Sequence, residues 1–208
     1  HAAGCLYLRQ PNTAIPAIGR WLSSGDLQDR RAGVIAAGES GDATYALDFQ
    51  GSPNNLLVEN TTITGGTAKT VIGEDMTIRS SNLTGGADAL HLGSDFVLED
   101  SYLHDMRSGP GSHNDAIQST GGSNVVIRNN TLLGPYQEQT SAIIIQTNFR
   151  PIDNVSIDGN FLSGGAYTLY SNDRHNGYGP PTNVRVTDNV FEKGSSQYGH
   201  LATNALDQ

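Results

Sequence analysis

The feature that most constrains this chain is an internal repeat. Six segments align without gaps, and each reads Asn or Asp, apolar, any residue, apolar, then five positions to a further apolar residue and a small or turn-forming pair. A fixed period of this kind is the signature of a stacked repeat architecture. The segments are NLLVENTTITGG from Asn55, DMTIRSSNLTGG from Asp75, DFVLEDSYLHDM from Asp95, NVVIRNNTLLGP from Asn124, NVSIDGNFLSGG from Asn154 and NVRVTDNVFEKG from Asn183.

The spacing of the segments selects the type of repeat. Their starts lie 20, 20, 29, 30 and 29 residues apart, so the basic coil has about twenty residues and later coils carry insertions. Leucine-rich repeats have a similar period, but their Leu-rich signature and helical segment are missing from this pattern. Short runs of alternating apolar residues with Gly and Asn at the bends favour a parallel β-solenoid. Aligned residues of successive coils then lie about 4.8 Å apart.

The charges of the aligned segments agree with this stacking. The position after the second apolar residue alternates in sign over five coils, as neighbouring strands in register favour. An Asn or Asp begins every segment and indicates a bend. The alternating column is Glu59, Arg79, Glu99, Arg128, Asp158 and Thr187, and a further amide column is Asn130, Asn160 and Asn189. We interpret these columns as structural.

A second strand is predicted ahead of each segment. The sequence predicts a single all-β domain over residues 1–208, a parallel β-helix of about seven coils, with irregular coils or a cap over 1–44 and regular coils over 45–200. The chain ends soon after another strand begins, so a partner or a further segment is expected at the carboxyl end. The predicted strands are YALDFQ from Tyr45, KTVIG from Lys69, DALHLG from Asp88, DAIQS from Asp115, SAIIIQ from Ser141 and YTLYS from Tyr167.

Composition limits the classes of partner. The formal net charge of −9 argues against nucleic acid or an anionic membrane as the main partner. Lys69 and Lys193 are the only lysines, so we expect any local cationic patch to consist of arginine. Cys5 is the only cysteine, which excludes an intrachain disulfide or a thiolate metal cluster. No apolar run approaches the length of a membrane span.

From about Cys5 to Gly199 the chain resembles a known family. The residues that carry the likeness are DALHLGSDFVLEDSYLHDMRSGPGSHNDAIQSTGGSNVVIRNNTL from Asp88 to Leu132, followed by TSAIIIQ, GGAYTLY and GPPTNVRVTDNVF. They are similar to the right-handed parallel β-helix proteins of the pectate-lyase-like superfamily, in particular to a group of secreted bacterial β-helix proteins. This resemblance implies a right-handed helix, an extracellular location and activity on polysaccharides. The superfamily contains lyases, hydrolases, epimerases and proteins without an assigned reaction.

Departures from the repeat indicate the candidate site. The bland glycine turn is replaced once, by His104 and Asp105, immediately before the first long insertion, MRSGPGSHN, which leads into His113 and Asp115. Strand alternation points Ala89 and His91 outward when Leu90 and Leu92 point inward. Asp88 and Asp115 are expected to stack at the strand entrances. The predicted outward column is Asp48, Ile72, His91, Gln118, Ile144 and Tyr170.

The insertions add basic and aromatic residues around this column. We expect a groove over the coils of residues 88–178, with catalytic candidates on its floor and substrate-binding candidates on its loops. The catalytic candidates are His113, Asp115, His91, Asp88, His104, Asp105 and Tyr170. The substrate-binding candidates are Arg107, Gln118, Gln146, Arg150, Arg174, His175 and Tyr178.

Three functions fit these residues. The first is β-elimination on a polysaccharide that contains uronic acid, with arginine neutralising the carboxylate, His113 or His91 as base, and Tyr170 or Tyr178 as acid. In this class the resemblance implies calcium as a candidate cofactor, held by acidic residues such as Asp88 and Asp115. Otherwise no metal site is predicted. The expected partner is an acidic polysaccharide.

The other two functions use the same face differently. Asp88 and Asp115, with Asp105 nearby, can act as the paired carboxylates of a glycoside hydrolase. However, the NTDGxD, paired-Asp, GHG and RxK signatures of β-helix pectin hydrolases are not reproduced in this sequence. HNDAIQ resembles NTDGxD only in part. The third possibility is a non-catalytic module, in which aromatic and amide side chains bind a glycan or support assembly.

Overall fold

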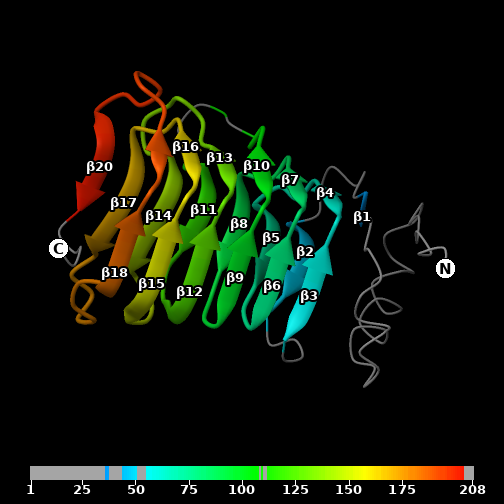
Figure 1. The fold of residues 1–208 in the computed structure, drawn as a ribbon, viewed down its shortest axis with the longest axis horizontal. Coiled ribbons are helices and arrows are strands. Elements are labelled where there is room, and N and C mark those ends of the chain that lie inside the picture. Colours follow the sequence, from blue (N-terminus) through cyan, green and yellow to red (C-terminus); the bar gives the residue numbers. More distant parts are fainter. Residues whose placement is uncertain (1–35, 38–43, 51–54, 108, 110–111, 204–208) are drawn as a thin grey trace.

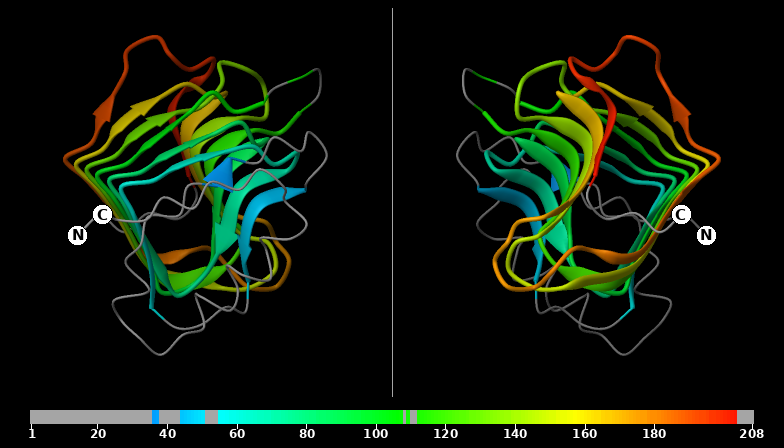
Figure 2. Two further views of the ribbon diagram at one scale, coloured as in Figure 1. Left: turned by 90° about the vertical axis from the view of Figure 1, so that its right-hand side faces the viewer. Right: turned by 90° about the vertical axis from the view of Figure 1, so that its left-hand side faces the viewer.

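The computed structural model describes residues 36–37, 44–50, 55–107, 109 and 112–203. These residues form strands and turns arranged as a parallel β-helix, which confirms the predicted fold class (Figure 1). Viewed along its axis, the molecule has a three-sided outline (Figure 2). The expected early coil around Cys5 to Ile15 lies outside the described residues. None of the described segments is a helix able to span a membrane.

Each complete coil contributes one strand to each of three sheets, one strand more per coil than the sequence pattern predicted. Sheet A contains β1 (Ala36–Ala37), β4 (Thr62–Thr64), β7 (Asn82–Thr84), β10 (Tyr102–His104), β13 (Thr131–Leu133), β16 (Phe161–Ser163) and β19 (Val190–Phe191). Sheet B contains β2 (Tyr45–Phe49), β5 (Lys69–Gly73), β8 (Asp88–Leu92), β11 (Asp115–Ser119), β14 (Ser141–Thr147), β17 (Tyr167–Asp173) and β20 (Gly199–Thr203). Sheet C contains β3 (Leu56–Glu59), β6 (Met76–Arg79), β9 (Phe96–Glu99), β12 (Gly122–Arg128), β15 (Ile152–Asp158) and β18 (Thr182–Thr187).

The bends before and after sheet C explain why Asn and Asp recur in the sequence. Every repeat begins with a residue in the left-handed region, with φ between 51° and 62°, where Asn and Asp are tolerated better than other non-glycine residues. A second left-handed residue follows each sheet C strand and turns the chain into sheet A. These second positions are Asn60, Ser80, Asp100, Asn129, Gly159 and Asp188.

The polar columns predicted from the repeat form continuous ladders. Asn130 Nδ2 donates to Asn160 Oδ1 over 3.0 Å, and Asn160 Nδ2 donates to Asn189 Oδ1 over 2.9 Å. On the face of sheet C, Arg79 pairs with Glu59 at 2.5 Å and Arg128 pairs with Glu99 at 2.5 Å. Because these partners belong to successive coils, the contacts fix the register of the stack.

The interior is filled by apolar side chains stacked coil upon coil, mostly one from each strand of sheet A and two or more from most strands of sheets B and C. In sheet B the buried column is Leu47, Val71, Leu90, Ile117, Ile143 and Leu169. These residues alternate with the outward column predicted from the sequence, and this alternation leaves one side chain per coil at the centre of the outer face of sheet B.

The entrance of each sheet B strand departs from simple alternation. Ala89, which the pattern points outward, is fully buried, and so is Thr168. The reason is the turn that leads from sheet A into sheet B: Thr70 Oγ1 accepts a hydrogen bond from Gly86 N and donates to Thr84 O in that turn. A Cβ on Gly86 would lie 2.4 Å from Thr70 N. The close approach needs glycine, and it covers the strand entrances.

Candidate functional site

The outer face of sheet B carries the predicted column in register. Strand pairing links Asp48 to Ile72, Ile72 to His91, and His91 to Gln118. The column continues through Ile144 and Tyr170. The structure therefore confirms that these positions are vertical neighbours, and the groups around them form the candidate site.

The centre of the site is Lys69, at the entrance of β5. Its ammonium pairs with Asp88 Oδ2 on the next coil and donates to Gln118 Oε1 over 2.7 Å. An ammonium has three N–H donors, and these two contacts within the described part of the chain use two of them. The Lys69 side chain is 18% exposed, whereas that of Asp88 is 2% exposed. Within the described residues, the partly exposed Lys69 ammonium therefore has one donor beyond these two contacts.

Asp88 and Asp115 are buried on successive coils, and each carboxyl group accepts a hydrogen bond. The backbone N–H of Asp115 donates to Asp88 Oδ1 over 2.9 Å, and Ser141 Oγ donates to Asp115 Oδ1 over 2.5 Å. Burial and the neighbouring charge of Asp88 raise the pKa of Asp115 to about 8. Burial also raises the pKa of Asp88, although the charge of Lys69 acts against this rise. At neutral pH the carboxyl group of Asp115 is accordingly mostly protonated.

His113 lies at the mouth of this cluster. Its side chain is exposed, and its charge is one of the influences that lower the pKa of Asp88, so the imidazole lies within electrostatic reach of that carboxyl group. The neighbouring Asn114 is fully buried and anchors the loop, because its Nδ2 donates to the carbonyl oxygens of Ala87 and Arg107. The sequence HND thus presents an exposed imidazole, a buried anchor and a buried acid in turn.

Tyr170 borders the cluster from two coils further along. Its phenolic oxygen accepts a hydrogen bond from Tyr167 N over 3.3 Å, which leaves the phenolic hydrogen for another acceptor. Burial raises the pKa of Tyr170, and the charge of Asp115 adds to the rise. Tyr170 is therefore a protonated phenol beside the acidic pair, with its ring packed edge-on against Tyr167.

His91 occupies the outward column but is not suited to be a proton acceptor. Burial, followed by the charges of Lys69 and Arg150, lowers the pKa of His91 to about 4, so the ring is neutral at neutral pH. Its Nε2 lies 3.0 Å from Thr120 Oγ1, within hydrogen-bonding distance. These properties favour a binding role for His91 over the catalytic role that was also predicted.

Arg150 lies at the opposite end of the sheet B strands from Lys69. Its Nη2 is 3.3 Å from Glu74 Oε2, and both residues line a cavity of about 390 Å³ together with His91 and Thr120. A Cβ on Gly121 would come within 2.6 Å of Arg150 Cβ, so this glycine permits the arginine to cross the end of the strand. The outer face of sheet B therefore carries a cation at each end of its strands, Lys69 at the entrance and Arg150 at the cavity.

The remaining substrate-binding candidates surround this groove at different positions. Gln146 faces outward on β14 and pairs in register with Asn172. Arg107 is exposed in the loop that precedes His113. Arg174, His175 and Tyr178 are exposed on the loop after β17, where His175 Nδ1 lies 3.3 Å from Asp173 Oδ2. The loop residues after β17 therefore lie nearer to the Arg150 end than to the Lys69 end of the strands.

His104 and Asp105 belong to a different surface. His104 lies on sheet A, where its Nδ1 is 2.7 Å from Asp105 Oδ2 and its Nε2 is 2.8 Å from Asn82 Oδ1. Its ring also stacks on Tyr102, with a centroid distance of 3.9 Å. The structure thus engages His104 with sheet A neighbours and does not gather it with the Lys69 cluster.

The acidic pair does not fit calcium, the cofactor implied by the resemblance. Calcium takes six to eight oxygen ligands, but the carboxyl groups of Asp88 and Asp115 already bond Lys69, a backbone N–H and Ser141. Within the described ranges, no group of three or more His, Cys, Asp or Glu side chains is placed to hold a metal ion. We therefore assign calcium no role in the proposed reaction.

Comparisons with known proteins assign no role to any residue of this chain. No family model and no curated protein matches the chain. Among solved structures, an alginate lyase from Paenibacillus sp. str. FPU-7 matches at 9% sequence identity, with coverage of 77% of this chain and 87% of that chain and a TM-score of 0.37. The residue roles below follow from the contacts of this chain alone.

Sequence reasoning missed Lys69, although a signal was present. We expected any cationic patch to consist of arginine, but the cation at the centre of the cluster is a lysine. KTVIG, DALHL, DAIQS and SAIII align at their first residues, and this alignment places Lys69, Asp88, Asp115 and Ser141 in one vertical column. A lysine above two aspartates in that column predicts an ion pair between coils.

Proposed function

We propose that this protein is a secreted, polysaccharide-active β-helix that cleaves a uronic-acid-containing glycan by β-elimination in the groove of sheet B. The observation that carries the proposal is the Lys69 cluster: an ammonium fixed between Asp88 and Gln118, an exposed imidazole at His113 and a protonated phenol at Tyr170. These groups supply a cation, an acid–base group and, further along the same face, a phenol for sugar binding.

The proposed reaction assigns one role to each group. The third N–H donor of Lys69, assisted by Arg107, binds and partly neutralises the uronate carboxylate, which acidifies the adjacent C5 proton. His113 removes that proton, and the electron pair forms the C4–C5 double bond as the C4–O glycosidic bond breaks. His113 then returns this proton to the departing oxygen, because Tyr170 lies four strands along sheet B from Lys69, about 19 Å between backbones, and is placed to bind a sugar residue further along. His91, Gln146 and Arg150 bind neighbouring sugar residues further along the groove.

The buried carboxyl groups act as positioning residues in this proposal. Asp88 and Asp115 are each 1% exposed, so neither reaches a polymer that lies on the surface. This burial argues against glycoside hydrolysis by the pair, since that mechanism needs both carboxyl groups in contact with the sugar. Asp88 instead fixes the ammonium of Lys69, and Asp115 with Ser141 fixes Asp88.

A non-catalytic glycan-binding role is the second candidate. It is favoured by the charge balance of the groove, where Lys69 pairs with Asp88 and Arg150 pairs with Glu74, so that little net positive charge is left to stabilise a developing anion. In that case the same side chains bind a glycan without turnover.

Incubation with a panel of uronic-acid polymers separates these candidates. β-Elimination gives products with the ultraviolet absorbance of an unsaturated uronate, hydrolysis gives new reducing ends without that absorbance, and binding alone gives neither. We expect His113→Gln to lower kcat at least a hundredfold through loss of the acid–base group. The matched His200→Gln, exposed on β20, should stay within about threefold of the wild-type protein. Equal activity of both variants would remove His113 from the mechanism.

A further inference from the structure

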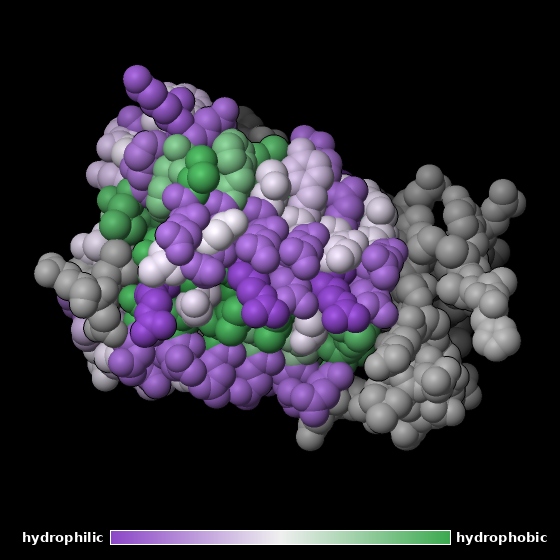
Figure 3. All heavy atoms as spheres, viewed as in Figure 1, coloured by the Kyte–Doolittle hydropathy of each residue, from purple (hydrophilic) through white to green (hydrophobic). Residues whose placement is uncertain are grey.

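The outer face of sheet A carries a second ordered column. Strand pairing places one outward residue of each coil directly above the next. Three members are large, exposed hydrophobic residues: Tyr102 at 40%, Phe161 at 36% and Val190 at 59% exposure. Hydrophobic spheres are visible on this side in Figure 3, in the region where Figure 1 labels β13 and β16. The column is Thr62, Asn82, Tyr102, Thr131, Phe161 and Val190.

The two aromatic rings in this column are two coils apart. Tyr102 pairs with Thr131, and Thr131 pairs with Phe161. Two strand spacings amount to about 9.5 Å along the helix axis. In an extended, β-1,4-linked polysaccharide, alternate sugar residues present the same face at about this repeat. The two rings can therefore stack on two sugar residues of one linear chain, with the hydroxyl of Thr131 between them.

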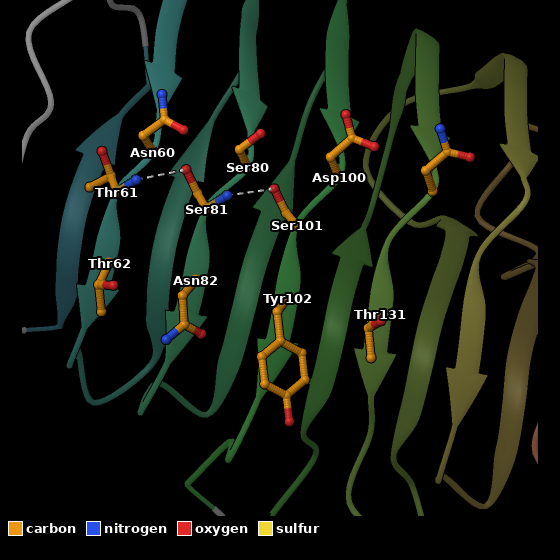
Figure 4. A pocket seen from close by; sticks show the side chains of 11 residues that line it. Asn60, Thr61, Thr62, Ser80, Ser81, Asn82, Asp100, Ser101, Tyr102 and Thr131 are labelled. Carbon is orange, nitrogen blue, oxygen red and sulfur yellow. Dashed lines mark hydrogen bonds between the residues drawn. The ribbon is translucent and has the colours of Figure 1, made fainter.

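Tyr102 is held in place before any ligand arrives. Its ring stacks on His104 at an interplanar angle of 17°, and His104 is fixed through both ring nitrogens. Figure 4 shows Tyr102 between Asn82 and Thr131 on the strands that follow the corner of sheets C and A. An aromatic ring that is already ordered loses little conformational entropy on binding, which favours its use as a platform.

The groove beside Tyr102 is polar but nearly uncharged. It encloses about 690 Å³, and its lining consists of Asn, Thr, Ser and Tyr side chains apart from Asp100. Thr61 N donates to Ser81 Oγ, and Ser81 N donates to Ser101 Oγ (Figure 4). The hydroxyl groups of Ser81 and Ser101 therefore bond the backbone at the corner between sheets C and A. The outer groups, Asn60, Thr62 and Ser80, are exposed. Without a cation in the lining, this groove favours a neutral glycan over a uronate.

We propose that the outer face of sheet A is a second, non-catalytic binding surface for a neutral, linear polysaccharide that lies along the helix axis across Tyr102, Thr131 and Phe161. This proposal does not depend on the function proposed for sheet B. The two surfaces belong to different sheets and differ in charge, so the protein can bind a neutral polymer on one side and act on an acidic glycan on the other.

Affinity electrophoresis in gels that contain hydroxyethylcellulose or xylan tests the surface directly, with polygalacturonate as the charged comparison. We expect the neutral polymers to retard the wild-type protein. Tyr102→Ala and Phe161→Ala should each weaken association about five- to tenfold, the amount expected for the loss of one aromatic stacking contact. Tyr102→Phe, which keeps the ring, should bind within about twofold of wild type. Tyr136→Ala is the matched control, because Tyr136 is 63% exposed but lies outside the column.

Three outcomes would overturn the proposal. One is equal retardation of the wild type and both alanine variants while their thermal midpoints stay within a few degrees of wild type. Another is the absence of retardation by any neutral polymer. The third is a concentration-dependent dimer in sedimentation that both alanine substitutions abolish without any effect of glycan, which would make this face an interface between copies of the chain. His113→Gln, which should lose the activity of sheet B, should leave the retardation unchanged, and this result separates the two proposals.

Discussion

Replacement of Asp115 by asparagine should change how stability depends on pH. The carboxyl group of Asp115 is 1% exposed, and its pKa is raised to about 8 from an ordinary value of 3.8. Between these two values the folded protein binds a proton that the unfolded chain has released. The contribution of Asp115 to the free energy of unfolding therefore falls as pH rises through this window, by up to about 1.4 kcal/mol per pH unit, and levels off above pH 8.

The magnitude follows from the width of the window. The raised pKa of Asp115 corresponds to a contribution from this group that falls by roughly 5 kcal/mol between pH 4 and pH 8. Asparagine has no proton to lose and can still accept the hydrogen bond from Ser141 Oγ. Asp115→Asn should thus lack this fall, keep the rise between pH 4 and pH 6.5 that the lowered pKa of His91 gives both proteins, and exceed the wild type by several kcal/mol at pH 9.

Urea unfolding followed by circular dichroism at intervals from pH 4 to pH 9 measures this profile. Asp105→Asn is the matched control, since the Asp105 side chain is 83% exposed and bonds only its neighbour His104 among the described residues. Its profile should run parallel to that of the wild type. Parallel profiles for Asp115→Asn and the wild type would refute a buried, protonated Asp115.

The remaining predictions concern the ion pair, the base, the amide ladder and metal. Lys69→Met should destabilise the protein by about 3–5 kcal/mol at pH 7, because it strands a buried carboxylate, and the double variant Lys69→Met, Asp88→Asn should recover most of this loss in urea unfolding. His113→Ala should abolish turnover with a thermal midpoint close to that of the wild type, so a collapsed melt would mean a structural role. Asn160→Ala should cost about 2–4 kcal/mol, whereas Asn189→Ala at the ladder's more exposed end should cost less. A chelator should leave the thermal midpoint and the activity unchanged, and a change in either would indicate that the protein uses calcium.

The sequence predicted the stack of coils because the repeat has one physical cause in every coil. Each segment begins with a left-handed residue, and each apolar position fills the same interior, so alignment of the letters is alignment in space. The outward column through His91, Gln118 and Tyr170 followed from this alignment and from strand alternation. The third strand of each coil was missed because it spans only two or three residues around a single apolar side chain.

The candidate site was less predictable because burial depends on the turns that cover the strands. Alternation alone points Ala89 outward, but the glycine turn from sheet A buries it and closes over the strand entrances. Asp88 and Asp115, expected as catalytic groups, share the parity of the inward-facing Leu90 and Ile117, and they are buried and bonded to neighbours. The split of His104 from the other histidines also needed coordinates, since a residue at a corner can face either sheet.

A crystal structure of His113→Ala with a bound uronate oligosaccharide tests the central claim most directly. We expect a sugar carboxylate within hydrogen-bonding distance of Lys69 Nζ, with the position of the missing His113 side chain beside C5 and the adjacent glycosidic oxygen. An oligosaccharide bound away from Lys69, for example on sheet A, would contradict it.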